Sequence, residues 1–512
     1  MKMSRLLSGV VLLLCGCSDV DNAVNKTTTG AEIHWHKGQV DSAFAMAREE
    51  NMPLFFYWGA EWCPPCQEIK NTVFKHPKFV SLSQLFVPVY LDGDTEQAQL
   101  VGEQFAVQGY PTMIVFNSAG KEITRIPGGI DTRRYLDVLA LSLNNGKQMN
   151  ELIAEAASKP EALSSEDLTQ LAFYSWGQDN LPIGTEDTLA LLKGLAFLNR
   201  PPDELAIARL LLSYLAVQTD LDLDHLNPSE KLTAASRLQD YLQHSDTVLA
   251  NIDYLSFYAD KITKLLALPA EQQQSFISQW QTSVAQQRDN PLLSKAEKLG
   301  TWMTPVSFFW LQYPDADSIP PPLADNIQTA IATVNSNTEG DERQSVINRA
   351  GNVLRAAKLY PQARELIQAE LALSKSPYYF MSSMAEIAEE TGNYEDSVDW
   401  RRRAYEAAKG KATRFQWGVE YASALIQYQP QNGEEIKHTA SALFDNLDQG
   451  GDVFTGRNYG RLNTLLDNLQ QWQSEARTDT LADFIGQLQT LCDQTDPESP
   501  TRQQCQRLMA EY

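Results

Sequence analysis

The chain has 512 residues and a formal net charge of −23 at pH 7, with 65 acidic side chains against 42 basic ones. This charge opposes binding to nucleic acids and adsorption to anionic lipid headgroups, so neither is expected as a partner. The length predicts more than one domain. The six histidines form no ligand pattern, and we expect neither a metal site nor a cofactor.

The N-terminus has the features of an export signal. Lys2 and Arg5 precede an apolar run over residues 6–14, which is too short to span a bilayer because a spanning helix needs about 20 residues. The run leads into the sequence LCGC, whose last residue is Cys17, and this resembles a bacterial lipobox. We expect residues 1–16 to be a lipoprotein signal peptide and Cys17 to be lipidated, with an ordinary secretory signal as the alternative.

The residues after Cys17 predict where the mature chain is held. Ser18 at this position favours sorting to the outer membrane of a two-membrane bacterium, facing the periplasm. Residues 17–30 are polar and contain a threonine run, which is typical of a flexible tether. We therefore expect a protein of the cell envelope whose membrane attachment is the lipid anchor only.

Short apolar runs alternate with helix-compatible segments from residue 31 to residue 145. This alternation predicts an α/β sheet domain. The expected strands cover residues 53–58, 85–91, 113–116 and 122–126, and the expected helices cover residues 40–50, 67–75, 95–105 and a segment from 131.

Cys63 and Cys66 follow the first of these strands, at the expected start of a helix. Their spacing lets two thiols close a small disulfide ring, and a helix N-terminus lowers the pKa of the first thiol. Half of a zinc site is the alternative, but it needs a second pair, and the next cysteines are the distant Cys492 and Cys505. The pair therefore predicts thiol–disulfide exchange.

Further motifs accompany the pair. Tyr110-Pro111-Thr112 follows it by about 45 residues, and Gly128-Gly129 comes later. Together with the sequence AEWCPPC, which ends at Cys66, these motifs make residues 31–145 resemble a thioredoxin-fold domain, in particular the C-terminal domain of the periplasmic thiol reductase DsbD. The resemblance implies a cis peptide bond before Pro111, an ordinary trans turn proline being the alternative.

The same resemblance implies a mechanism and partners. Cys63 would attack a partner's disulfide, and Cys66 would then resolve the mixed disulfide. Trp62, Tyr110 and Pro111 would form the docking surface, with the backbone at Tyr110 pairing with the partner's extended chain; for Trp62, simple packing is the alternative. The implied substrates are protein disulfides or thiols, and the implied electron donor is a DsbD-like membrane reductase.

Two departures from the thioredoxin pattern concern the thiol chemistry. Pro64 and Pro65 lack a backbone N–H, so the first donor available to the Cys63 sulfur is Cys66. A helix terminus contributes up to about 2 kcal/mol, or about 1.5 pKa units. We therefore expect a moderately lowered pKa for Cys63 and a reducing potential, well below the roughly −120 mV of the strong oxidant DsbA.

The second departure is Tyr57, six residues before Cys63, where thioredoxins usually carry a buried aspartate. A phenol with a pKa of about 10 is a poor base at neutral pH. Glu61 is close in sequence, but we interpret it as a solvated surface charge. The sequence therefore identifies no residue that would accept the proton of the Cys66 thiol.

Residues 150–512 have a helical composition, with apolar residues at three- and four-residue intervals. The triple proline at 320–322 predicts a division into two helical regions, residues 150–320 and 323–512. A shift of 34 residues aligns the two halves of a segment at about 343–410. This period predicts two tetratricopeptide (TPR)-like units within an α-solenoid-like array.

Cys492 and Cys505 are the last two cysteines. In a disulfide-permissive compartment we expect them to form a structural disulfide between two terminal helices. A second redox pair that exchanges with Cys63 is the alternative, although nothing around it is activating.

Two functions are consistent with these features. The first is thiol–disulfide exchange on envelope proteins, reductase or isomerase-like, with the helical region recruiting partners. The second is a helical-repeat scaffold or chaperone-like adaptor in which the thioredoxin-like domain mainly binds.

Overall fold

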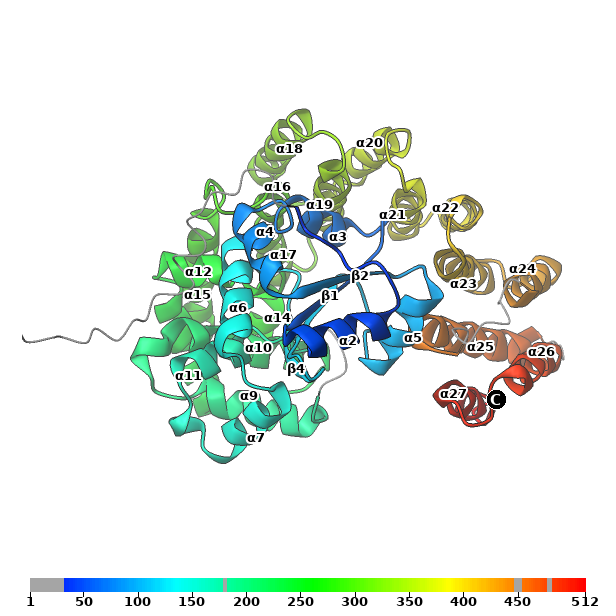
Figure 1. Ribbon diagram of the computed structural model, residues 1–512. Helices are drawn as coiled ribbons and strands as arrows, with labels where there is room; N and C mark the ends of the chain where they lie inside the picture. Colours follow the sequence, from blue (N-terminus) through cyan, green and yellow to red (C-terminus); the bar gives the residue numbers. More distant parts are fainter. Residues whose placement is uncertain (1–31, 178–181, 446–453, 477–480) are drawn as a thin grey trace, which may run out of the picture.

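The computed structural model describes residues 32–177, 182–445, 454–476 and 481–512. A small sheet domain lies at the centre, and helices run around it in an arc that ends at α27 (Figure 1). This confirms the expected fold class, an α/β domain followed by a large all-helical region. The predicted signal peptide, tether and lipidated Cys17 lie outside the described residues.

The sheet has four strands in the order β2-β1-β3-β4. β1 and β2 are parallel with Leu54 opposite Val87, whereas β1 with β3 and β3 with β4 are antiparallel. The strands are β1 (Leu54–Gly59), β2 (Val87–Asp92), β3 (Thr112–Phe116) and β4 (Glu122–Ile126). The short 3-10 helix η1 (Ser83–Leu85) precedes β2, so the strand expected at 85–91 begins two residues later.

Strand β1 separates two hydrophobic cores because alternate side chains of a strand point to opposite faces. Phe55 and Tyr57 face one core and pack near α3 (Pro64–Asn71), α4 (Pro77–Leu82) and α6 (Thr132–Asn145). Phe56 and Trp58 face the other core, with α2 (Val40–Glu50) and α5 (Glu96–Gln104). All six residues of β1 are buried, as its unbroken apolar sequence predicts.

The helix expected at 67–75 is wrong in its bounds. It begins at Pro64, because prolines occupy the first turn, where a missing N–H loses no hydrogen bond. It ends at Asn71, and α4 begins afresh at Pro77. A residue before proline avoids the helical conformation, and His76 is extended with φ −72° and ψ 130°.

The rest of the chain is helical in the described residues. Its elements are α7 (Met149–Ser158), η2 (Pro160–Ala162), α8 (Ser165–Ala172), α9 (Thr185–Ala196), η3 (Pro201–Asp203), α10 (Glu204–Asp220), α11 (Pro228–Tyr241), α12 (Ser245–Ala250), α13 (Ile252–Phe257), α14 (Ala259–Leu266), α15 (Ala270–Ala285), α16 (Lys295–Gly300), α17 (Met303–Gln312), α18 (Pro321–Ser336), α19 (Glu342–Ala356), α20 (Tyr360–Leu371), α21 (Pro377–Glu390), α22 (Tyr394–Ala407), α23 (Lys411–Tyr428), α24 (Gly433–Asp445), α25 (Gly456–Ala476), α26 (Leu481–Gln494) and α27 (Pro500–Met509). None of these helices is both long and apolar enough to span a membrane.

The expected repeat segment contains two helical hairpins, α19 with α20 and α21 with α22, which pack one after another. Their assignment as TPR-like units stays a prediction, as does the division of the helical region at the triple proline.

Three cores organise the helices. The core on the α3 side of the sheet continues without interruption into α7–α15, so the sheet domain and these helices share one interior. A second core lies mainly between α16 and α21, and a third is formed mainly by α23–α27. We call α23–α27 the C-terminal arm. Because the arm has its own core, it can be regarded as a module docked on the sheet domain.

Candidate redox site

The cysteine pair lies at the N-terminus of α3, as the sequence predicts. Cys63 and Cys66 form a disulfide with their Cα atoms 5.2 Å apart. Cys63 is the N-cap residue, and the Cys66 N–H donates to its Sγ at 3.2 Å. Pro64 and Pro65 fill the first two helical positions, so Cys66 is the first backbone donor within the motif, as expected.

The loop before β3 completes the immediate site. The Tyr110–Pro111 peptide bond is cis, which confirms the prediction. The Tyr110 carbonyl oxygen lies 3.6 Å from Cys63 Sγ. Gly128 is packed so closely that a Cβ there would lie 2.9 Å from Cγ of Pro111. The glycine therefore allows the loop at 128–129 to approach the cis-proline.

Tyr57 occupies the position behind the pair. Its hydroxyl donates to the Cys66 carbonyl oxygen at 3.4 Å, and burial raises the pKa of Tyr57 well above its usual value. A phenol that holds its proton so firmly does not act as a base at neutral pH. Glu61 is exposed, in agreement with its interpretation as a surface charge.

The helical region covers the pair, which the sequence did not predict. Cys63 is only 2% exposed and Trp62 only 8%. The indole of Trp62 stacks on Tyr379 of α21 with ring centroids 6.2 Å apart. Its backbone carbonyl accepts a hydrogen bond from Gln344 of α19 at 3.1 Å. Trp62 is therefore part of an internal interface, and the expected docking surface is largely occupied by the chain's own helices.

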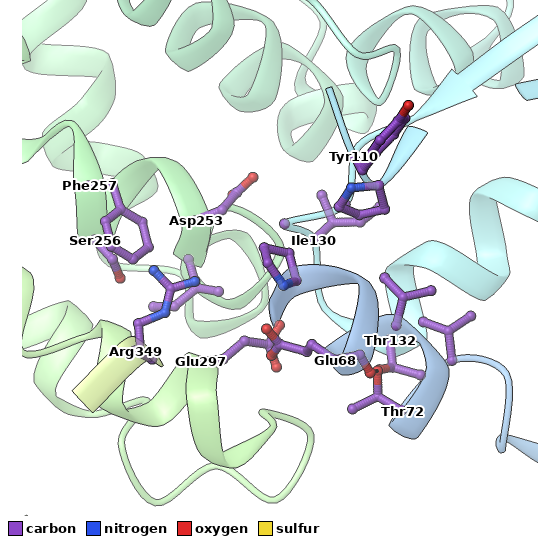
Figure 2. Close-up of a pocket in the computed structure, with 17 residues that line it drawn as sticks. Glu68, Thr72, Tyr110, Ile130, Thr132, Asp253, Ser256, Phe257, Glu297 and Arg349 are labelled. Atoms are coloured by element: carbon purple, nitrogen blue, oxygen red, sulfur yellow. Dashed lines mark hydrogen bonds between the residues drawn. The ribbon is translucent and has the colours of Figure 1, made fainter. Parts of the chain in front are cut away.

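A cavity of about 320 Å³ remains beside the pair (Figure 2). Its floor comes from α3 and the cis-proline loop, with Pro65 and Pro111 among the lining residues. Its roof comes from α13, α16 and α19, which contribute Asp253, Glu297 and Arg349. The cavity thus joins the sheet domain to residues far away in sequence.

Glu297, which lines this roof, has a raised pKa. Glu297 is the third residue of α16, where its carboxylate and Ser294 form a capping box. The Ser294 hydroxyl also donates to Glu68 of α3 at 2.5 Å, so two carboxyl groups converge at this point. Burial, and then the negative charge of Glu68, raise the pKa of Glu297 to about 8.

We expect Glu297→Gln to stabilise the protein at pH 8 but not at pH 5. The folded state holds the Glu297 proton more tightly than the unfolded chain does, so the wild type loses stability as pH rises from about 5 to 8. Glutamine is neutral and preserves the capping box. Urea unfolding should show a gain of about 1 to 2 kcal/mol at pH 8 and none at pH 5. Glu61→Gln, at an exposed position, is the control, and an equal gain at both pH values would contradict the assignment.

Comparison with known proteins agrees with this geometry. A family model described as a thioredoxin-like domain matches residues 40–142. Residues 40–142 are thus a thioredoxin-like domain. The thiol:disulfide interchange protein DsbD of Photorhabdus laumondii is 28% identical over 101 residues, which are 19% of this chain and 17% of that protein. DsbD of Yersinia pestis is 32% identical over 108 residues, covering 20% of this chain and 17% of that protein.

A shorter protein shows the same likeness. Thioredoxin H4 of Arabidopsis thaliana is 31% identical over 84 residues, which are 16% of this chain and 65% of that protein. The chain spans less than a fifth of the length of the DsbD relatives. These likenesses, together with the Cys63–Cys66 pair, support thiol–disulfide exchange in general terms.

Cys492 and Cys505 form the second disulfide, with their Cα atoms 5.8 Å apart. Both are buried in the core of the C-terminal arm, where the bond joins α26 to α27. Its role as a structural bond stays a prediction. Among the described residues no cluster of histidine, cysteine and acidic side chains could hold a metal ion.

Proposed function

We propose that the chain is a thiol–disulfide oxidoreductase, acting as a reductase or isomerase-like exchanger. The observation that carries the proposal is the disulfide at the N-terminus of α3 beside the cis-Pro111 loop, with Cys63 Sγ 3.6 Å from the Tyr110 carbonyl. Thiol–disulfide exchange requires an activated thiolate, a second thiol to resolve the intermediate and a surface that aligns the partner. The helix start, Cys66 and the cis-proline loop supply these three elements.

The reaction begins from the dithiol form, which a partner dithiol generates by reducing the pair. The Cys63 thiolate attacks one sulfur of a protein disulfide; one S–S bond forms to Cys63 while the partner's S–S bond breaks and releases a thiolate, which takes a proton. Cys66 loses its proton to solvent and attacks Cys63, which frees the second partner thiol. Two electrons thereby pass from the pair to the partner.

The helical region has a selective role in this proposal. It roofs the cavity beside Pro111 and covers Trp62 through Tyr379 and Gln344. A partner must therefore fit the remaining opening or displace these contacts. In this proposal the helical region not only recruits partners, as expected from the sequence. The roof and the C-terminal arm also determine which partners can reach the cysteine pair.

The adaptor function remains the second candidate because Cys63 is 2% exposed. A disulfide shielded to this degree is suited to a domain that binds more than it reacts. Measured turnover distinguishes the two functions.

We expect the full chain to reduce insulin with dithiothreitol as the electron source, and Cys63→Ser to abolish that activity. Serine has no thiolate, so loss to the uncatalysed rate is the expected result. Cys492→Ser/Cys505→Ser is the control that retains activity if the second disulfide is structural. A wild-type chain with no turnover in the reduced state would favour the adaptor.

The substrates and the compartment require separate experiments. Cys66→Ser leaves the mixed disulfide unresolved, so mass spectrometry of trapped complexes names the partners, and a DsbD-like membrane reductase is the proposed donor. We also propose that the protein is anchored in the cell envelope through Cys17, on the basis of the LCGC sequence. The mass of the mature N-terminal peptide tests this anchor. Truncation after residue 150 is unsuitable, since it would expose the shared core.

A further inference from the structure

Arg457 brings a positive charge from the C-terminal arm to the cysteine pair. It is the second residue of α25, and its guanidinium carbon lies 4.9 Å from the ring centroid of Trp62 and 5.1 Å from that of Tyr110. These two residues flank Cys63, because Trp62 precedes it and the Tyr110 carbonyl touches its sulfur. The guanidinium therefore lies in the wall of the redox site.

The two terminal nitrogens of Arg457 are buried and have no hydrogen-bond partner among the described residues. Other arginines of the helical region are paired: Arg209 with Asp253, Arg343 with Glu370 and Arg355 with Glu386. A buried cation that makes no hydrogen bond to an anion is unfavourable.

Three carboxyl groups in this part of the structure accept hydrogen bonds from other donors or pair with other cations. Glu103 of α5 accepts hydrogen bonds from the Gly456 N–H and the Gln504 amide. Asp94, after β2, accepts from Thr413, and burial raises the pKa of Asp94 although Arg457 and Thr413 partly offset this.

Glu420 of α23 is likewise paired, with Arg401 and with Arg461, the other cation of α25 near this site. Asp94, Glu103 and Glu420 are all formally anionic, but none of their carboxylate oxygens accepts a hydrogen bond from the Arg457 terminal nitrogens. In the disulfide form the guanidinium thus faces the rings of Trp62 and Tyr110, where its charge acts on the Tyr110 hydroxyl, and its terminal nitrogens make no hydrogen bond to a carboxylate.

We propose that Arg457 is the electrostatic partner of the Cys63 thiolate, which forms when the disulfide is reduced. This inference rests on the proposed function and adds a residue from outside the thioredoxin-like domain to its chemistry. On reduction, two electrons and two protons from a partner dithiol convert the disulfide to two thiols, and Cys63 then releases its proton to solvent. The resulting negative charge appears near the Arg457 guanidinium, whose terminal nitrogens make no hydrogen bond to a carboxylate.

The proposal also accounts for the double proline. Only the Cys66 N–H points to the Cys63 sulfur from within the motif, because Pro64 and Pro65 have none. A charge in a poorly solvated site acts over several ångströms, so Arg457 can supply stabilisation that the backbone lacks. The stability of the Cys63 thiolate would then require that the C-terminal arm, which carries Arg457, is packed against the sheet domain.

The test measures the pKa of Cys63 in the reduced full chain. Alkylation by iodoacetamide is followed against pH in a Cys66→Ser background, and mass spectrometry identifies the peptide that contains Cys63. We expect Arg457→Gln to raise the pKa of Cys63 by about one unit and Arg457→Lys to raise it by less than half as much. Arg402→Gln is the control, because Arg402 pairs with Asp399 and Glu406 on its own helix, and should leave the pKa unchanged.

A pKa of Cys63 that stays within about 0.2 units in Arg457→Gln would overturn the proposal. If that variant does not fold, as judged by near-ultraviolet circular dichroism, Arg457→Met carries the test because its apolar stem still packs on the rings. The readout does not require turnover. A chain that shows the pKa shift but reduces no insulin would therefore refute the oxidoreductase function while leaving the Arg457 contact supported.

Discussion

Arg209→Met is expected to lower the free energy of unfolding by about 3 kcal/mol, because it leaves a carboxylate without its partner inside the protein. Arg209 of α10 is 1% exposed, and its terminal nitrogens donate to the two Asp253 oxygens at 2.5 and 2.7 Å. The guanidinium also stacks on Tyr254, with its carbon 4.2 Å from the ring centroid. Asp253 lies against Gly129 of the sheet domain, so the pair holds the roof of the cavity in place.

Two comparisons make this prediction specific. Arg209→Met/Asp253→Leu should recover at least half of the loss, because an apolar pair removes the unpaired charge. Lys261→Met breaks a solvent-exposed pair with Asp220 at the end of the same helix and should change stability by less than about 0.5 kcal/mol. Equal losses for the buried and the exposed pair, in urea unfolding at pH 7, would contradict the interpretation.

Glu103→Ala is expected to raise the rate at which a phosphine reduces the Cys63–Cys66 disulfide by about tenfold. The Glu103 carboxylate accepts the Gly456 N–H at 2.7 Å and also binds Gln504, so it attaches both α25 and α27 to the sheet domain. Hydrogen bonds to a charged group contribute about 1.5 to 3 kcal/mol. Losing them favours states in which the arm has moved away and the disulfide is open to solvent.

Glu96→Ala serves as the matched control, since Glu96 is an exposed acid on the same helix. Its reduction rate should equal that of the wild type. Hydrogen exchange should show faster labelling of α25 and α27 in Glu103→Ala than in Glu96→Ala. Suppose that Glu103→Ala is reduced by the phosphine at the wild-type rate although the amides of α25 and α27 exchange faster. The arm then does not protect the Cys63–Cys66 disulfide from the reductant.

The sequence was sufficient for the thioredoxin-like domain because its signals are local. The helix at 40–50 and the strand at 122–126 have the bounds expected from residue patterns. The cis bond before Pro111 followed from a motif resemblance. The pair was expected at the start of a helix and lies there, but α3 ends at Asn71, four residues before the end of the segment expected to be helical.

The cover over the pair could not be predicted, because no local signal encodes it. Gln344, Tyr379 and Arg457 are each ordinary helical residues that contact Trp62. Their helices α19, α21 and α25 follow one another along the helical arc around the sheet domain (Figure 1). The core that the sheet domain shares with α7–α15 could not be predicted for the same reason. Amphipathic spacing predicts that a helix buries one face, but it does not identify the surface on which that face packs.

The burial of Cys63 also imposes an order of events while the chain is being made. The residues that pack on the neighbouring Trp62 follow Cys63 by roughly 280 to 390 positions. At a synthesis rate of about 5 to 20 residues per second, Arg457 emerges about 20 to 80 seconds after the cysteines. During that interval the pair is open to any oxidant or reductant in its surroundings. Oxidants and reductants therefore reach the sulfur atoms more easily in the incomplete chain than after the later helices have packed around Trp62.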